Sequence, residues 1–187
     1  MRDYHGQNRM DFNLERIRIS KENPQRGEES MNKTLIAYFS ASGVTARAAE
    51  RLAKSTGADL YEIVPAVPYT DQDLNWMNAK SRSSVEMNDP ASRPEIRERA
   101  EGMEDYDKIL IGFPIWWNLA PTIINTFLES YDFSGKEAAV FATSGGSGVE
   151  HAARNLKKQY PHMEWKGAAL VNSAKAAEQF ADRVKSK

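Results

Sequence analysis

The chain has 187 residues, a length typical of one domain with a substantial core. Its formal net charge of −1 gives no reason to expect binding to nucleic acid or to an anionic membrane. It contains no cysteine, which excludes disulfides, thiolate metal ligands and thiol catalysis, and which fits a cytoplasmic location. No apolar run approaches the roughly 20 residues of a membrane-spanning helix.

Residues 1–30 differ in composition from the rest of the chain. They are polar, carry equal numbers of basic and acidic residues, and lack the continuous apolar stretch of a secretory signal. Met31 stands just ahead of the first apolar run. We therefore expect residues 1–30 to be an extension outside the core that does no chemistry, and residues 31–187 to form the folded domain.

The first strand is expected at Leu35–Phe39, where five apolar or aromatic residues follow one another. Such a run is typical of a strand buried on both faces in a parallel sheet. A polar turn, S-A-S-G-V-T, follows directly and leads into a helical pattern that ends at Gly57. A strand that turns directly into a helix leaves free backbone N–H groups at the positive end of the helix dipole, where phosphate binds readily. The candidate anion ligands are Ser40, Ser42, Gly43, Val44 and Thr45.

An ordinary connection in which these hydroxyls only cap the helix is the alternative to an anion site. The chain lacks the P-loop pattern G-x-x-x-x-G-K-[ST] and the dinucleotide pattern G-x-G-x-x-G, so neither of those nucleotide sites is expected.

A long connection over residues 65–106 follows a second expected strand at Asp59–Val64. The capping box Thr70–Asp73 predicts a helix that starts near Asp71, whereas Ser81–Pro94 is polar and is expected to be irregular. A connection of this length is uncommon unless it covers or builds a site.

Three more strands, each followed by a helical pattern, complete the chain. Pro121 is expected in the first turn of one of these helices, and Ser173 is expected to cap the last. Alternation of strands and helices predicts a three-layer, doubly wound α/β fold around a five-stranded parallel sheet of order 2-1-3-4-5. The three strands are expected at Lys108–Gly112, Glu137–Thr143 and Trp165–Val171.

In that strand order the loops after strands one, three and four are neighbours at the carboxyl edge of the sheet, where ligands of such folds bind. The first loop offers an anion site. The second, at 113–118, offers two adjacent indoles, and the third, at 143–148, offers glycines whose backbone can approach a ring edge. Flavin mononucleotide (FMN), with one phosphate and a large planar ring, meets all three requirements.

The turn Ser40–Thr45 resembles the phosphate loop T/S-x-T/S-G-x-T of the flavodoxin family, and the resemblance continues through GFPIWWNLAP and TSGGSG over residues 32–187. It is strongest with bacterial flavodoxin-like proteins that have a long segment after strand two. The resemblance implies that the five anion-loop residues bind the FMN phosphate. It implies that the isoalloxazine is flanked by Pro114, Ile115, Trp116 and Trp117. It also implies that the pyrimidine side is lined by Ser144, Gly145, Gly146, Ser147 and Gly148.

The resemblance further implies electron transfer to a redox partner protein or to a small-molecule electron acceptor. The run FPIWWN lacks the glycine that many flavodoxins place beside the flavin N5, which predicts a preference for two-electron chemistry. The three loops contain no Lys or Arg, which predicts a low potential because a buried flavin anion would lack a counter-charge.

Three other functions are alternatives for the same residues. An NAD(P)H-dependent quinone or flavin oxidoreductase is the main alternative, with residues 65–106 shaping a substrate pocket. A serine hydrolase at Ser144 needs an Asp or Glu and then a His after the serine, and it is disfavoured because His151 and His162 precede Asp182, while Glu150 is adjacent to His151 on one helix. A phosphoacceptor receiver domain would need acidic residues where Ser40 stands, and the three histidines have no metal-ligand spacing, so no metal is expected.

Overall fold

The computed structural model describes residues 33–185, which form five strands and five helices. The strands are β1 (Thr34–Tyr38), β2 (Asp59–Glu62), β3 (Lys108–Pro114), β4 (Glu137–Thr143) and β5 (Glu164–Leu170). The helices are α1 (Val44–Thr56), α2 (Arg82–Asn88), α3 (Ile123–Glu129), α4 (Glu150–Gln159) and α5 (Ala174–Lys185), with a 3-10 turn at Met103–Asp105. The prediction for residues 1–30 lies outside the described residues.

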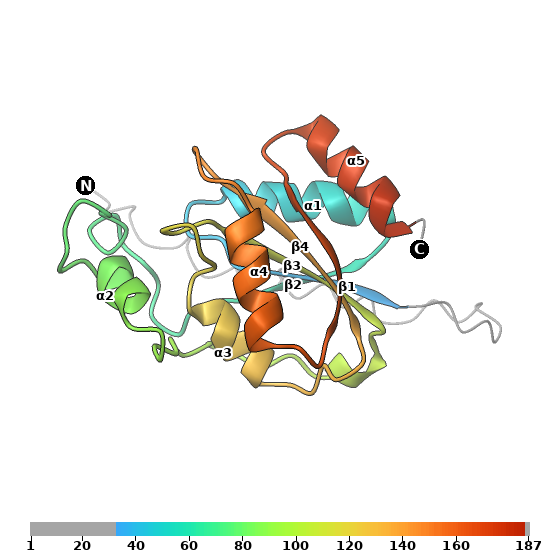
Figure 1. Ribbon diagram of the computed structural model, residues 1–187, viewed down its shortest axis with the longest axis horizontal. Coiled ribbons are helices and arrows are strands. Elements are labelled where there is room, and N and C mark those ends of the chain that lie inside the picture. The colour runs from blue at the N-terminus through green and yellow to red at the C-terminus, as the bar shows by residue number, and fades with distance from the viewer. Residues whose placement is uncertain (1–32, 186–187) are drawn as a thin grey trace, which may run out of the picture.

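All five strands are parallel, and their order is β2-β1-β3-β4-β5, which confirms the predicted doubly wound sheet. Helices α1 and α5 cover one face, and α3 and α4 cover the other (Figure 1). Side chains of β1 alternate between the two faces: Leu35 and Ala37 pack with α3 and α4, whereas Ile36 and Tyr38 pack with α1 and α5. Strand β1 is therefore buried on both faces, as its continuous apolar run predicts.

Helix α1 follows its predicted pattern with one exception. Ala48, Ala49 and Leu52 are buried against the sheet, but Val44 is 45% exposed at the start of the helix. Gly57 ends the helix in a left-handed conformation, with φ 72°, and donates its N–H to the carbonyl of Ala53 at 2.8 Å. The predicted C-terminal cap is confirmed, since glycine adopts this conformation without strain.

The connection after β2 differs from its prediction. Thr70 and Asp73 form the reciprocal capping hydrogen bonds, yet only a single turn follows, and the expected helix at Asp71 is wrong. The apolar side chains that such a helix would bury, Trp76 and Met77, are 71% and 76% exposed. A short helix that buries no apolar face lacks the tertiary contacts that would stabilise it.

Helix α2 forms instead within the stretch expected to be irregular. It is capped by Ser81, whose side chain accepts the N–H of Ser84, and both of these residues are buried. We call residues 65–96 the excursion, because it leaves the sheet after β2 and returns to its starting point (Figure 1). Its base is closed by two backbone hydrogen bonds, from Ala66 to Glu95 and from Arg97 to Val64, each 2.8 Å long.

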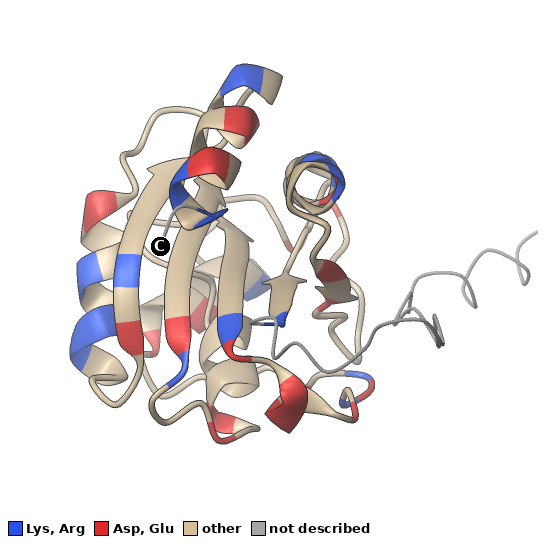
Figure 2. Ribbon diagram, turned by 90° about the vertical axis from the view of Figure 1, so that its right-hand side faces the viewer, with Lys and Arg blue, Asp and Glu red and all other residues tan. Residues whose placement is uncertain are grey.

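Within residues 33–185, every helix is too short or too polar to cross a membrane. The same part of the chain holds no group of three or more side chains suited to a metal ion. Basic and acidic residues are interspersed at the amino ends of the strands, where Glu137 pairs with both Lys108 and Lys166 (Figure 2).

Candidate functional site

Hydrogen bonds join the three loops that follow β1, β3 and β4. The buried hydroxyls of Thr45 and Thr143 lie 2.8 Å apart and link the first loop to the third. The N–H of Ile115 donates to the carbonyl of Thr143 at 2.9 Å and links the second loop to the third. The structure thus brings together the three groups of residues that the strand order predicts to be neighbours.

The first loop is held by the side chain of Ser40. Its oxygen accepts the N–H groups of Gly43 and Ala46, each at 3.1 Å. Gly43 has φ 82°, a left-handed conformation in which a side chain would be strained. The Ser40 hydroxyl hydrogen remains available to donate outward.

Several N–H groups at this turn have no acceptor among the described residues. Among residues 33–185, no hydrogen bond uses the N–H of Ser42, Val44 or Thr45. Val44 and Thr45 occupy the first turn of α1, where N–H groups have no partner inside the helix and the dipole is positive. The turn therefore places these N–H groups at the positive end of α1, and the binding of an anion there stays a prediction.

Arg47 lies beside the same turn and was missed by the sequence analysis, which considered only the loops. A guanidinium nitrogen of Arg47 lies 3.5 Å from the position that a Cβ on Gly43 would take. The two residues are four apart, so both lie on one face at the start of α1. The four-residue spacing between Gly43 and Arg47 is the feature of the sequence that could have identified Arg47.

The second loop is a two-residue turn between Trp116 and Leu119. These residues exchange backbone hydrogen bonds of 3.0 and 2.9 Å, and the central residues Trp117 and Asn118 have φ of 47° and 63°. A turn with two positive φ values is a type I′ turn, which suits Asn118 but is strained for a bulky residue such as Trp117. The carbonyl of Asn118 is also 3.2 Å from Nδ1 of His151 on α4.

The two adjacent indoles have different surroundings. Trp116 is partly buried, and its ring contacts Phe39 and Tyr69 edge-on at centroid distances of 5.6 and 5.5 Å. Trp117 is 45% exposed. Pro114 and Ile115 precede the pair at the end of β3 and are partly buried. Trp117 is thus the indole with a free surface.

The third loop, like the first, is held by a serine side chain that accepts two backbone N–H groups. The Ser144 side chain accepts the N–H groups of Gly146 and Ser147 at 3.2 and 2.8 Å. Its backbone is clamped by Asn172, which accepts the Ser144 N–H at 3.0 Å and donates to the Ser144 carbonyl at 2.9 Å. Asn172 was missed by the sequence analysis, although its place just after β5 in a parallel sheet is a signal for this edge. A Cβ would find open space at Gly145 and Gly146, but would meet Glu150 at Gly148.

The flavodoxin family model matches residues 33–187. This chain belongs to the flavodoxin family.

Solved structures show how far the likeness to other flavodoxin-family proteins extends. A candidate flavoprotein from Bacteroides eggerthii is 53% identical, with a TM-score of 0.79 over 83% of this chain and 99% of that one. A candidate flavoprotein from Bacteroides uniformis is 49% identical, with a TM-score of 0.78 over 81% and 98%. A flavoprotein from Lactobacillus acidophilus, in complex with FMN, is 25% identical, with a TM-score of 0.62 over 76% and 95%. A search of curated proteins gives no significant match.

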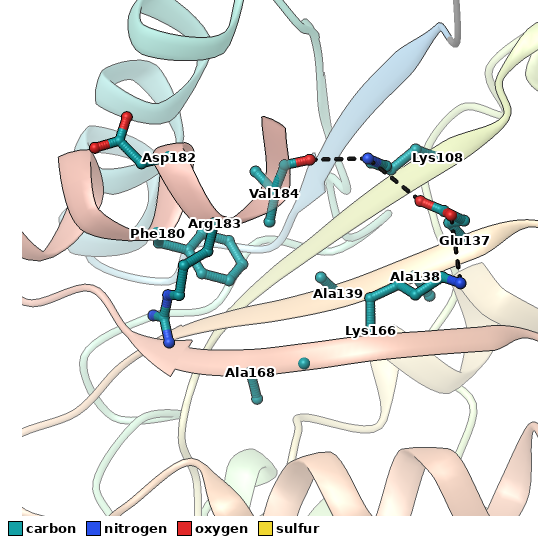
Figure 3. A pocket seen from close by; sticks show the side chains of 11 residues that line it. Lys108, Glu137, Ala138, Ala139, Lys166, Ala168, Phe180, Asp182, Arg183 and Val184 are labelled. Carbon is teal, nitrogen blue, oxygen red and sulfur yellow. Dashed lines mark hydrogen bonds and ion pairs between the residues drawn. The ribbon is translucent and has the colours of Figure 1, made fainter. Parts of the chain in front are cut away.

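A separate cavity of about 370 Å³ lies between α5 and the sheet of this flavodoxin-family chain (Figure 3). Lys108 and Glu137, the first residues of β3 and β4, lie at its edge, so it is at the amino ends of the strands and away from the three loops. Lys108 Nζ is held by the carbonyl of Val184 at 2.8 Å and by Glu137 at 3.3 Å. This cavity is therefore distinct from the candidate site.

Proposed function

We propose that this chain binds FMN at the carboxyl ends of β1, β3 and β4 and acts in electron transfer. The observation that carries the proposal is the turn after β1. There, N–H groups with no acceptor among residues 33–185, the left-handed Gly43 and the guanidinium of Arg47 lie together at the start of α1. These are the features that a phosphate group requires. Relatives of this chain support the proposal, since the Lactobacillus acidophilus flavoprotein was crystallised with FMN.

The phosphate would be held mainly by backbone groups. The N–H groups of Ser42, Val44 and Thr45 are the available donors, and the Ser40 hydroxyl adds another. The Thr45 hydroxyl can also donate to the phosphate if it accepts the hydrogen of Thr143, since either atom of that pair can be the donor. Gly43 lets the backbone approach the ligand closely.

The isoalloxazine would lie against the second and third loops. Trp117 offers the exposed indole face, and Pro114 and Ile115 support the turn from the end of β3. The backbone of residues 144–148 lies open at Gly145 and Gly146 and can approach the pyrimidine edge. FMN, when bound, supplies the redox chemistry, and these residues bind and orient it.

A calorimetric titration tests the proposal. The purified full-length chain, stripped of any bound flavin, is titrated with FMN and then with riboflavin, which lacks the phosphate. We expect FMN to bind at least tenfold more tightly than riboflavin, because the anion loop contacts only the phosphate. No binding of either compound would overturn the proposal.

An NAD(P)H-dependent quinone or flavin oxidoreductase on the same fold is the second candidate. The contact between Tyr69 of the excursion and Trp116 favours it, because it brings an extra segment to the edge of the proposed flavin site. Steady-state oxidation of NADPH with a quinone as acceptor separates the two: turnover supports an oxidoreductase, whereas its absence in the flavin-loaded protein supports a carrier that needs a partner protein.

A further inference from the structure

Three aromatic rings from three different segments meet next to two loops of the proposed flavin site. Phe39, Tyr69 and Trp116 contact one another pairwise, with centroid distances between 5.5 and 5.7 Å. Phe39 directly precedes the anion loop at Ser40, and Trp116 directly precedes Trp117. Tyr69 is the member that comes from the excursion, so this cluster joins the excursion to the roots of both binding loops.

Helix α2 holds Tyr69 in place from the other side. The Arg82 guanidinium lies 3.9 Å from the centre of the Tyr69 ring, and the Tyr69 hydroxyl donates to Glu86 at 2.5 Å. Arg82 itself pairs with Glu86 at 2.7 Å and donates to the carbonyl of Val67 at 2.7 Å. Burial, and then the hydrogen bond to Glu86, raises the pKa of the Tyr69 phenol well above its usual range, so it remains a donor.

The turn next to this cluster needs such support. Trp117 and Asn118 both have positive φ, and although asparagine tolerates this conformation, a bulky residue such as Trp117 adopts it only when its surroundings impose it. Both backbone hydrogen bonds that close the turn involve Trp116. A shift of the Trp116 indole would therefore shift the turn and the exposed indole that it carries.

We propose that Tyr69, held by Arg82 and Glu86, is a positioning residue that fixes Trp116 and so sets the orientation of the Trp117–Asn118 turn against the isoalloxazine. The inference rests on the proposed binding of FMN. It assigns the excursion a role in the flavin site beyond covering the edge of the sheet. Tyr69 acts through Trp116, and not through the phosphate loop.

The test compares Tyr69→Ala, Tyr69→Phe and Val85→Ala in the full-length chain. Phenylalanine keeps the ring contacts and loses only the hydrogen bond to Glu86, whereas Val85 is an exposed residue of the same helix α2 and serves as the matched control. Dissociation constants for FMN and riboflavin, and the midpoint potential of the bound flavin, are measured for each variant.

We expect Tyr69→Ala to raise the dissociation constants of both FMN and riboflavin at least tenfold and to shift the midpoint potential of the bound flavin. The ratio of the two dissociation constants should remain within twofold of the wild-type ratio, because the phosphate loop is unchanged. Tyr69→Phe should restore most of the affinity, and Val85→Ala should match the wild type. A general loss of folding would instead remove binding in both Tyr69 variants and alter the far-ultraviolet circular dichroism.

The inference is overturned if a folded Tyr69→Ala protein binds riboflavin within twofold of the wild type at an unchanged potential. If Tyr69→Ala does not fold, the double variant Arg82→Met with Glu86→Met takes its place, since it keeps the Tyr69 ring and removes both the cation and the hydrogen-bond acceptor that hold it. A tenfold loss of affinity in that variant supports the inference, and unchanged affinity overturns it. A wild-type chain that binds neither compound would refute the proposed function first, so the two failures are distinguishable.

Discussion

Two serines organise the candidate site in the same way. The side-chain oxygens of Ser40 and Ser144 each accept two backbone N–H groups from the loop that follows. In a tight turn some backbone N–H groups have no backbone acceptor, and each serine oxygen supplies one. Each serine can still donate its own hydroxyl hydrogen to another acceptor. These hydrogen bonds restrain each loop, and a restrained loop loses less conformational entropy when it binds a ligand.

At this scale Arg47 gives the first prediction. Arg47→Gln removes the positive charge beside Gly43, and we expect FMN to bind roughly two to five times more weakly, because exposed charge pairs contribute up to about 1 kcal/mol. The effect should shrink at 1 M salt and should be absent for riboflavin. Arg51, exposed one turn further along α1, is the matched control, and an equal loss in Arg51→Gln would contradict the prediction.

Gly112 gives the second prediction. A Cβ at this position would lie 2.0 Å from the tip of the Phe141 ring, which is fully buried. We expect Gly112→Ala to lower the free energy of unfolding by roughly 1–3 kcal/mol, the usual range for an overpacked core. Urea denaturation measures the change. Adding Phe141→Leu should recover part of it, and strictly additive losses would show that the two sites do not compete for space.

At the scale of elements, the excursion is anchored near its return to the sheet as well as at Tyr69. Arg93 forms a two-pronged ion pair with Glu129 at the end of α3, with distances of 2.7 and 2.8 Å. The same carboxylate accepts the hydroxyl of Tyr160 at 2.8 Å. Burial raises the pKa of Tyr160 to about 12, so this donor persists at neutral pH.

The Glu129 contacts predict a dependence of stability on pH. The hydrogen bonds from Arg93 lower the pKa of the Glu129 carboxyl, so the unfolded chain binds its proton more readily than the folded chain does. The stabilisation is complete above about pH 5 and is lost as the pH falls through the folded pKa, below the ordinary glutamate value of about 4.3. The loss is modest because the pair is partly exposed.

Urea denaturation between about pH 5 and pH 3 checks this dependence. We expect Glu129→Gln and Arg93→Met to flatten the fall in the free energy of unfolding over that range. An identical slope in Glu129→Gln and the wild type would rule out this contribution.

The turn from Trp116 to Leu119 predicts the redox behaviour of bound flavin. Two backbone hydrogen bonds close it, the Asn118 carbonyl contacts His151, and it has no glycine. Reversal of a peptide in this turn would break these contacts, so we expect reduction by two electrons with little one-electron-reduced flavin. An anaerobic titration followed by absorbance checks this, and Asn118→Gly should increase the one-electron form. An abundant blue intermediate in the wild type would contradict the prediction.

At the scale of the whole molecule, the formal net charge is −1, and both signs are interspersed where the strands begin (Figure 2). Such a surface does not steer a charged partner over long distances. We expect the rate of electron transfer to a charged acceptor to change less than about threefold between low and physiological ionic strength. Stopped-flow measurements test this, and a tenfold change would reveal a local charged patch that dominates the encounter.

The sheet and its three loops could be predicted because their signals are local. The apolar run Leu35–Phe39 and the turn that follows it are consecutive in the sequence. The excursion could not be predicted in the same way, because the exposure of Trp76 and the contact of Tyr69 with Trp116 depend on residues far apart in the chain. Asn172 likewise acts on Ser144 only once β4 and β5 are paired.

The closed base of the excursion has a consequence for engineering. Val64 and Arg97 are hydrogen-bonded neighbours, so the excursion begins and ends at nearly the same place in the fold. A short glycine linker between these two residues could therefore replace the excursion without changing the path of the strands.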